Sequence, residues 1–192
     1  MQELETRERV INTAVGLFYT KGIQAVGMDL LRESAGVSLR TLYRLFPSKD
    51  AIVLAVLRRS QVIWNESLDA RVVLADTPRD KLLAIYDYLA DWFTDDSFRG
   101  CCFINSFAEV GPASPEVAAI AREHKASFQA YVAHIAAEAG FPAELAAQLA
   151  ILAEGALTTA AISGSGEAAG QARRAAEVLI GACLPPQPMA SA

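Results

Sequence analysis

The sequence predicts an all-α fold of about nine helices, in which a small N-terminal three-helix domain precedes a larger helical domain. Apolar residues recur at helical spacing along almost the whole chain, as in Ile11, Ala14, Val15 and Phe18, which fall at i, i+3, i+4 and i+7. Glycine or proline stands where these segments end, and no alternating apolar run is joined to another by a hairpin turn. With 53% hydrophobic and 20% charged residues among 192, the composition is typical of a folded globular protein.

The N-terminal domain, expected over residues 1–47, contains three predicted helices. The first ends near Thr20, the second spans Met28 to Ala35, and the third runs from the capping residue Ser38 to the residue before Pro47. Gly22 stops the first helix. Gly36 supplies the turn between the second and third helices, where we expect a side chain to force the two helices apart.

The second domain is expected over residues 48–184 and begins with a helix capped by Ser48 that continues to Leu57 or as far as Leu68. The next helix starts at Thr77-Pro78, because a proline in the first turn loses no hydrogen bond. The apolar runs 72–74 and 101–104 have strand propensity but no pairing partner, so we interpret them as a connection and as helix. Later helices are expected over residues 114–140, 143–162 and from the turn at 163–166 to Leu184, followed by a disordered tail over 185–192.

The charge is divided unevenly between the two ends of the chain. Residues 1–60 hold nine Lys or Arg against six Asp or Glu, whereas residues 61–192 hold eight against sixteen, within a total of −5. A basic N-terminal end on an acidic protein is expected if only that end meets phosphates.

Several classes of protein are disfavoured by what the sequence lacks. The cysteines Cys101, Cys102 and Cys183 have no disulfide-framework spacing, and we interpret them as structural thiols in preference to redox sensors. No CxxC pair accompanies the two histidines, so we expect no metal site, and without a nucleophile elbow or phosphate-binding loop we expect no enzyme and no cofactor. No uninterrupted apolar run approaches the roughly 18 residues of a membrane span. With no secretory leader either, we expect a cytoplasmic protein without a membrane partner.

The segment from Met28 to Lys49, MDLLRESAGVSLRTLYRLFPSK, has the properties of a helix-turn-helix. Two short helices meet at Gly36 and are expected to pack through small and aliphatic side chains. The second helix then presents outward Ser38, Leu39, Arg40, Thr41 and Arg44. Arg40 carries forked donors that fit the edge of a guanine, and hydroxyl groups for phosphates come from Ser38, Thr41 and Tyr43.

The order Phe18, Gly22 and then AGVS-x-x-TLYR-x-F-x-SK closely resembles the N-terminal domain of the tetracycline-repressor (TetR) family. The matching residues of the motif are Ala35, Gly36, Val37, Ser38, Thr41, Leu42, Tyr43, Arg44, Phe46, Ser48 and Lys49. The resemblance implies a transcriptional repressor that binds double-stranded operator DNA as a homodimer, pairs its last two helices in a four-helix bundle, and is released by a small-molecule inducer. The residues then expected to contact DNA are Ser38, Leu39, Arg40, Thr41, Tyr43, Arg44 and Lys49.

Three positions depart from the family pattern. Gly27 stands where a hydroxyl residue usually caps the second helix, so a phosphate contact there must come from a backbone N–H or be absent. Many members carry a small residue at the position of Arg40, whose assignment to a base therefore rests on its chemistry. Leu39 is apolar for an exposed position, and either touches a thymine methyl group or packs within the domain.

The second domain contains aromatic side chains between Tyr86 and Tyr131 that fill a core or line an inducer pocket. The candidates for the pocket are Trp92, Phe103, Phe107, His124, Phe128 and Tyr131. His124 is either a hydrogen-bonded core residue or a titrating group that faces the ligand. The alternative to a DNA-binding regulator is a helical ligand-binding or interaction protein whose helix-turn-helix no longer reads DNA.

Overall fold

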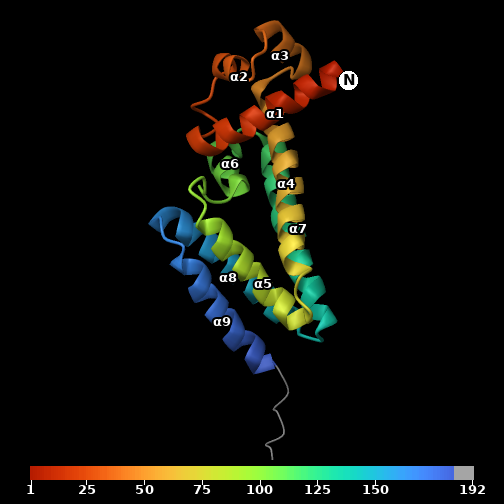
Figure 1. Cartoon of the computed structure of the whole chain (residues 1–192), viewed down its shortest axis with the longest axis vertical. Coiled ribbons are helices and arrows are strands. Elements are labelled where there is room, and N and C mark those ends of the chain that lie inside the picture. Colours follow the sequence, from red (N-terminus) through yellow and green to blue (C-terminus); the bar gives the residue numbers. More distant parts are fainter. Residues whose placement is uncertain (184–192) are drawn as a thin grey trace, which may run out of the picture. The chain divides into compact units, whose positions relative to one another are not determined.

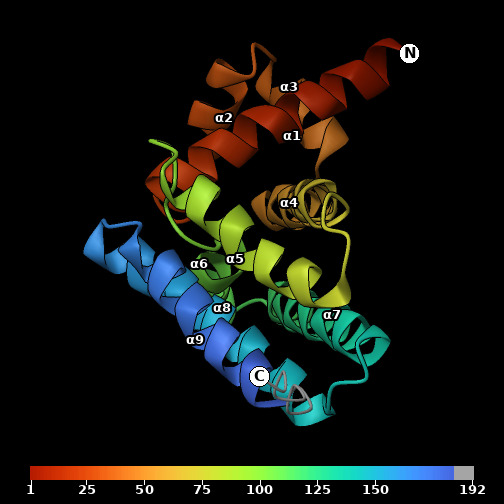
Figure 2. The same cartoon turned by 60° about the horizontal axis from the view of Figure 1, so that its bottom comes forward.

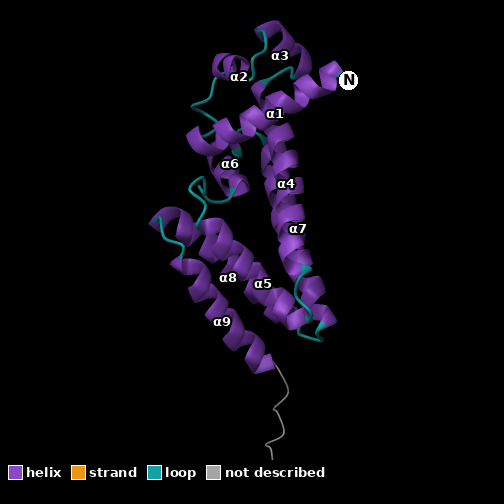
Figure 3. Ribbon diagram, in the orientation of Figure 1, coloured by secondary structure: helices purple, strands orange, loops and turns teal. Residues whose placement is uncertain are grey.

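The computed structural model describes residues 1–183, and in this part of the chain every regular element is a helix (Figure 3). In chain order (Figure 1) the helices are α1 (Gln2–Lys21), α2 (Met28–Ser34), α3 (Leu39–Leu45), α4 (Lys49–Val72), α5 (Pro78–Phe93), α6 (Cys102–Val110), α7 (Pro115–Glu138), α8 (Ala143–Ser163) and α9 (Glu167–Cys183). The predicted all-α class with about nine helices is confirmed. The tail predicted over residues 185–192 lies outside the described residues.

The described chain divides into two compact units. The first consists of residues 1–67 and 99–127, which hold α1 to α3, most of α4, α6 and the first half of α7. The second consists of residues 68–98 together with the described residues from 128 onward, which hold α5, α8, α9 and the remaining parts of α4 and α7. These units describe which helices pack together, and the functional boundary predicted between residues 47 and 48 stays a prediction.

The core of the N-terminal helices explains their arrangement in the first unit. α1 contacts α2, and α2 contacts α3, around the fully buried side chains of Leu31 and Leu42. The Arg7 guanidinium lies 4.7 Å from the centre of the buried Phe46 ring. Arg9 donates from Nε to the carbonyl oxygen of Ala35 at 3.0 Å, where α2 ends. Part of the positive charge at this end of the chain therefore holds the three helices together.

Two glycines in this region have left-handed backbone, for different reasons. A Cβ added to Gly36 (φ 65°) would meet no atom within 4 Å, so the expected clash between the helices was wrong. The turn requires glycine there because few side chains tolerate a positive φ. A Cβ on Gly22 (φ 82°) would lie 3.0 Å from Oε1 of Glu109, so that position needs glycine for its backbone and for the space.

The second unit is built on three helices, α5, α8 and α9, that contact one another pairwise and lie side by side in both Figure 1 and Figure 2. Small side chains, mostly alanine, line the buried faces of α8 and α9 and allow close packing. The buried Tyr86 of α5 donates its hydroxyl to the carbonyl oxygen of Leu149 at 2.7 Å. Arg173 of α9 donates to Asp87 of α5 at 2.7 Å. The three helices are thus joined by polar contacts as well as by burial.

α8 is apolar on its exposed face as well as on its buried one. Within the described chain Ile151 is 67% exposed and Ile162 is also exposed, whereas Leu149 and Ala153 are buried. By length and composition alone α8 would be able to cross a membrane, although its apolar residues are interrupted by polar ones. Of the most apolar 18-residue stretch of this helix, 44% is buried. The core helices of soluble proteins meet the same criterion, so one such helix is weak evidence for a membrane span.

Candidate functional site

The orientation of α3 is fixed by its cap and by its buried side. Ser38, in extended conformation, accepts a hydrogen bond from the backbone N–H of Thr41 at 3.1 Å. The two hydroxyl groups of Ser38 and Thr41 also lie 2.9 Å apart and share a hydrogen bond. Leu42 points into the core, so the opposite side of α3 faces away from the domain.

That opposite side carries the residues that the sequence assigned to DNA. Leu39, Arg40, Tyr43 and Arg44 are all exposed, and Thr41 is half-buried. Neither Arg40 nor Arg44 forms an ion pair or side-chain hydrogen bond with another described residue. Their guanidinium groups therefore keep their donors for a ligand.

A further cation stands at the start of α4. Ser48 accepts a hydrogen bond from the N–H of Ala51 at 3.1 Å, and α4 begins at Lys49. Lys49 is half-buried and has no ion pair within the described chain. At the start of α2, Gly27 provides no side-chain cap. The prediction that a phosphate contact at this cap position comes from a backbone N–H or is absent therefore stays a prediction.

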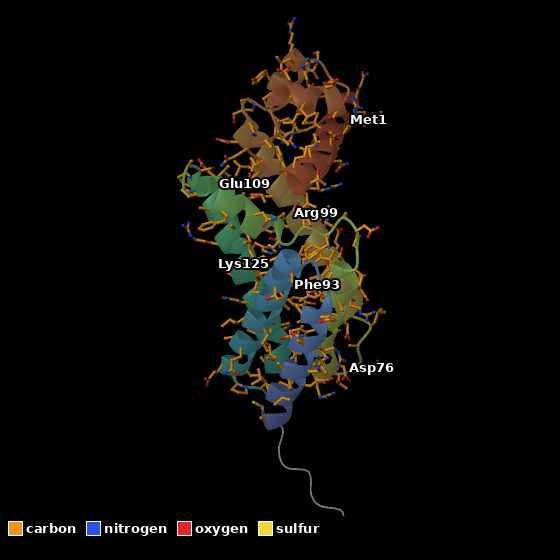
Figure 4. All side chains as sticks on the ribbon, turned by 90° about the vertical axis from the view of Figure 1, so that its left-hand side faces the viewer. Met1, Asp76, Phe93, Arg99, Glu109 and Lys125 are labelled. Atoms are coloured by element: carbon orange, nitrogen blue, oxygen red, sulfur yellow. The ribbon has the colours of Figure 1, made fainter. Side chains whose placement is uncertain are left out.

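The end of α1 is bonded to the segment that contains α6 (Figure 4 labels Arg99 and Glu109). The Tyr19 hydroxyl accepts from the N–H of Arg99 at 2.8 Å and donates to the carbonyl oxygen of Gly100 at 2.9 Å. Burial raises the pKa of Tyr19 to about 12, so the hydroxyl keeps its proton for this bond. Gln24, after α1, donates from its backbone N–H to Oε2 of Glu109 at 3.0 Å and from its side chain to the carbonyl oxygen of Glu109 at 2.8 Å.

These two links join residues more than 80 positions apart in the sequence. Sequence reasoning missed them because neither a tyrosine at the end of a helix nor a glutamate on an amphipathic helix indicates a distant partner. The glycine at position 22 was the one local signal, and it was explained by helix termination alone.

A buried imidazole lies deeper in the first unit. His124 of α7, 3% exposed, stacks on Phe103 of α6 with ring centres 3.8 Å apart and planes at 7°. Its Nδ1 lies 2.7 Å from Oε1 of Gln61, and the Trp64 ring stands at 75° to the imidazole with ring centres 5.8 Å apart. Burial, and then the positive charge of Lys125, lower the pKa of His124 to about 4. The imidazole is therefore neutral near pH 7, and Nδ1 donates to the Gln61 carbonyl.

The remaining candidate pocket residues are distributed differently. Phe107, also in the first unit, is exposed. Trp92, Phe128 and Tyr131 belong to the second unit, where the rings of Trp92 and Phe98 stand at 79° to each other with centres 5.1 Å apart. Burial, and then a hydrogen bond to Asp69, raise the pKa of Tyr131. Among the six candidates, Phe103 and His124 lie in ring contact with each other. Their neighbours Gln61 and Trp64 had no local signal in the sequence.

The cysteines near α6 differ in their surroundings. Cys101 is buried, and the Lys125 ammonium donates to its sulfur at 3.5 Å. Burial raises the pKa of the Cys102 thiol to about 12, so this sulfur stays protonated near neutral pH. Cys183 is exposed, and all three are free thiols.

Two family models match the chain. One, described as bacterial regulatory proteins of the tetR family, matches residues 10–56 and so includes the whole helix-turn-helix. The other, the tetracyclin repressor-like C-terminal domain, matches residues 78–176, more than half of the chain. The chain belongs to the TetR family. It is a helix-turn-helix transcriptional regulator, as the resemblance predicted.

Individual TetR relatives match over almost their whole length. The HTH-type transcriptional regulator YjdC of Escherichia coli is 26% identical over 179 residues, which are 91% of this chain and 93% of that protein. The crystal structure of SCO4454, a TetR-family regulator from Streptomyces coelicolor, has a TM-score of 0.85 at 27% identity and covers 93% of this chain and 96% of that one. The reduced form of E. coli NemR, an HTH-type repressor, has a TM-score of 0.79 at 25% identity and covers 91% and 97%.

Proposed function

We propose that this TetR-family regulator is a cytoplasmic repressor that binds operator DNA as a homodimer and is released by a small-molecule inducer. The observation that carries the DNA-binding part is the exposed side of α3 with the adjoining start of α4. Arg40, Arg44 and Lys49 carry positive charge there without an ion pair among the described residues, in a chain whose net charge is −5. Such cations neutralise phosphates and release counterions, which supplies much of the affinity for DNA.

The proposed DNA contacts differ in kind. Lys49 binds phosphate as a point charge, and Arg40 reads a base through its forked donors. In the Ser38–Thr41 pair, one hydroxyl proton joins the two oxygens and the other remains available for a phosphate oxygen. The complete set is Ser38, Leu39, Arg40, Thr41, Tyr43, Arg44 and Lys49.

The test is selection of binding sites from random duplex DNA, followed by affinity measurements over a salt series. Lys49→Ala should weaken binding to every sequence and reduce the slope of log K against log salt by about one, whereas Arg40→Ala should also relax the base preference. The exposed Arg122→Ala on α7 removes the same charge outside the helix-turn-helix and should leave both quantities unchanged. If Arg40→Ala lost affinity equally for the selected and for random DNA, Arg40 would not be a base reader.

For the inducer we propose contact with Phe103 and His124, from among the six pocket candidates. A ligand releases DNA only if it binds one arrangement of the protein better than another. α6 carries Phe103, and the bonds of Tyr19 and Gln24 to the 99–109 segment give a physical route from that ring to α1. In the same assay, compounds that release the wild type from the selected DNA should fail on a folded Phe103→Leu variant. Release that persists in this variant would remove Phe103 from the inducer site.

The alternative, a helical binding protein that no longer reads DNA, predicts loss or neutralisation of the cations on α3 and at the start of α4. The intact Arg40, Arg44 and Lys49 favour the regulator. Selection that enriched no sequence above random DNA would reverse this preference.

A further inference from the structure

The exposed side of α3 carries two parallel rows of side chains with opposite chemistry. Leu39 and Tyr43 are four residues apart and so lie along one line of the helix, as do Arg40 and Arg44 on the neighbouring line. Leu39 is 39% exposed and Tyr43 is 48% exposed, while both arginines are exposed. A row that carries the apolar Leu39 and the aromatic ring of Tyr43 therefore stands directly beside a cationic row.

Leu39 occupies the position in α3 where a base contact is expected. It is the first residue of the helix, immediately after the Ser38 cap that fixes the N-terminal turn. In a helix-turn-helix, the N-terminal residues of the second helix approach the base edges of the major groove. The core of the domain is filled by Leu31, Leu42 and Phe46, all almost fully buried, whereas a large part of Leu39 stays exposed. Packing within the domain therefore leaves 39% of Leu39 uncovered and able to contact a ligand.

The chemistry of an isobutyl group restricts what Leu39 can recognise. It has no donor or acceptor for a phosphate, a sugar hydroxyl or the polar edge of a base. In the major groove the 5-methyl group of thymine is the apolar group that a base pair offers to such a side chain. Truncating Leu39 should therefore affect positions that carry thymine and no others.

The neighbouring arginine sets where this thymine lies. Leu39 and Arg40 are the first two residues of α3 and both are exposed, so both side chains reach outward from the same first turn of the helix. Arg40 has no partner among the described residues, and its fork fits O6 and N7 of guanine. We propose that Leu39 reads the methyl group of a thymine in the base pair next to the guanine read by Arg40, so that each half-site contains an adjacent thymine and guanine. The inference rests on the proposed binding of α3 to operator DNA.

The experiment uses the full chain and the duplex that it selects from random DNA. Each thymine is replaced in turn by deoxyuridine, which removes the methyl group and nothing else, and each guanine by 7-deazaguanine, which removes N7. One deoxyuridine position should weaken wild-type binding about fourfold, the value of one buried methyl group, and should leave Leu39→Ala unaffected. A 7-deazaguanine at the adjacent base pair should weaken the wild type and leave Arg40→Ala unaffected.

A matched control removes an equally exposed apolar side chain elsewhere in the first unit. Ile63, on α4, is 47% exposed, and Ile63→Ala should keep the full sensitivity to deoxyuridine. If the chain selects a DNA sequence but no deoxyuridine separates wild type from Leu39→Ala, or if the sensitive thymine is not beside the sensitive guanine, this inference is wrong while the proposed function stands. If no sequence is enriched, the operator proposal fails and the inference falls with it.

Discussion

His124 illustrates how one buried side chain makes stability depend on pH. Its imidazole stacks on Phe103, donates to Gln61 and is 3% exposed, so protonation would place an uncompensated charge inside the first unit. Burial lowers the pKa from 6.5 to about 4. Between these two values the unfolded chain binds more protons than the folded one, and acid therefore favours unfolding in this window.

A testable prediction follows from the lowered pKa of His124. As the pH falls from about 6.5 to about 4, the free energy of unfolding of the wild type should fall by an extra amount approaching ~1.4 kcal/mol per pH unit. His124→Gln, which cannot titrate, should lose this part of the slope even if it is less stable at pH 7. Chemical denaturation at several pH values measures it, with His134→Gln as the control for removing a histidine. Equal slopes for His124→Gln and wild type would contradict the buried neutral imidazole.

The sequence was sufficient to predict which residues of α3 face outward, but it did not reveal the partners of His124. The chemistry of Arg40 or Ser38 is read within one short helix, because a cap and a turn fix which side faces outward. The contacts of His124 join α7 to α4 and α6, and such long-range packing leaves no local pattern. The same limit hid the bond of Tyr19 to Gly100.

At the scale of the element, α1 depends on two glycines in opposite ways. Gly22 ends the helix with φ 82° and ψ 156°, a conformation that essentially only glycine adopts, and a Cβ there would lie 3.0 Å from Glu109. Gly16 lies within the helix, where a Cβ would meet no atom within 4 Å. Glycine in such an interior position costs conformational entropy.

The paired substitutions should therefore have opposite signs. Gly22→Ala should lower the free energy of unfolding by about 1 to 3 kcal/mol, because it strains the backbone and displaces Glu109. Gly16→Ala should raise it by about 0.5 to 1 kcal/mol. Both are measured by chemical denaturation at pH 7. If Gly22→Ala left the free energy of unfolding unchanged, the end of α1 would not require a residue with positive φ at position 22.

Element boundaries were predictable where a cap or breaker stood at the end, and less so elsewhere. Thr77-Pro78 and Ser38 mark helix starts that the structure reproduces within a residue. α4 runs to Val72, past the predicted limit near Leu68, because the residues after Leu68 include no breaker. Glycine was correctly expected in the turn at position 36, but the predicted reason, a clash between the helices, was wrong. A sequence shows that a turn holds glycine, and does not show whether a positive φ or a lack of space requires it.

At the scale of the molecule, the order and class of the helices follow from periodicity, whereas the division into packing units does not. The first unit combines α1 to α3 with α6, whose residues come more than 30 positions after Ser67. The predicted pocket residues were grouped by closeness in sequence, yet they fall into both units. Sequence proximity on amphipathic helices is thus a poor guide to which aromatic rings meet.

The proposed homodimer is a whole-molecule property that the second unit makes testable. α8 and α9 pack against each other, and each leaves an apolar side chain largely uncovered, Ile151 at 67% and Val178 at 71%. Gly155, exposed and four residues after Ile151 on α8, leaves room for a helix of a second copy to approach closely. The proposed dimer would bury this apolar surface, and the apolar character of both faces of α8 would then follow.

Sedimentation at micromolar concentration should accordingly show a dimer for the wild type. Ile151→Glu and Val178→Glu should each shift the protein toward monomer, because association would bury an unpaired carboxylate. Leu74, also in the second unit and 74% exposed, lies outside α8 and α9, and Leu74→Glu should leave the dimer intact. Operator affinity should fall in Ile151→Glu and Val178→Glu, because these variants lose the dimer and two helix-turn-helix modules must reach two half-sites together. Leu74→Glu should keep the operator affinity of the wild type. A monomeric wild type would contradict the proposed homodimer. A dimer insensitive to both variants would place the partner surface away from α8 and α9.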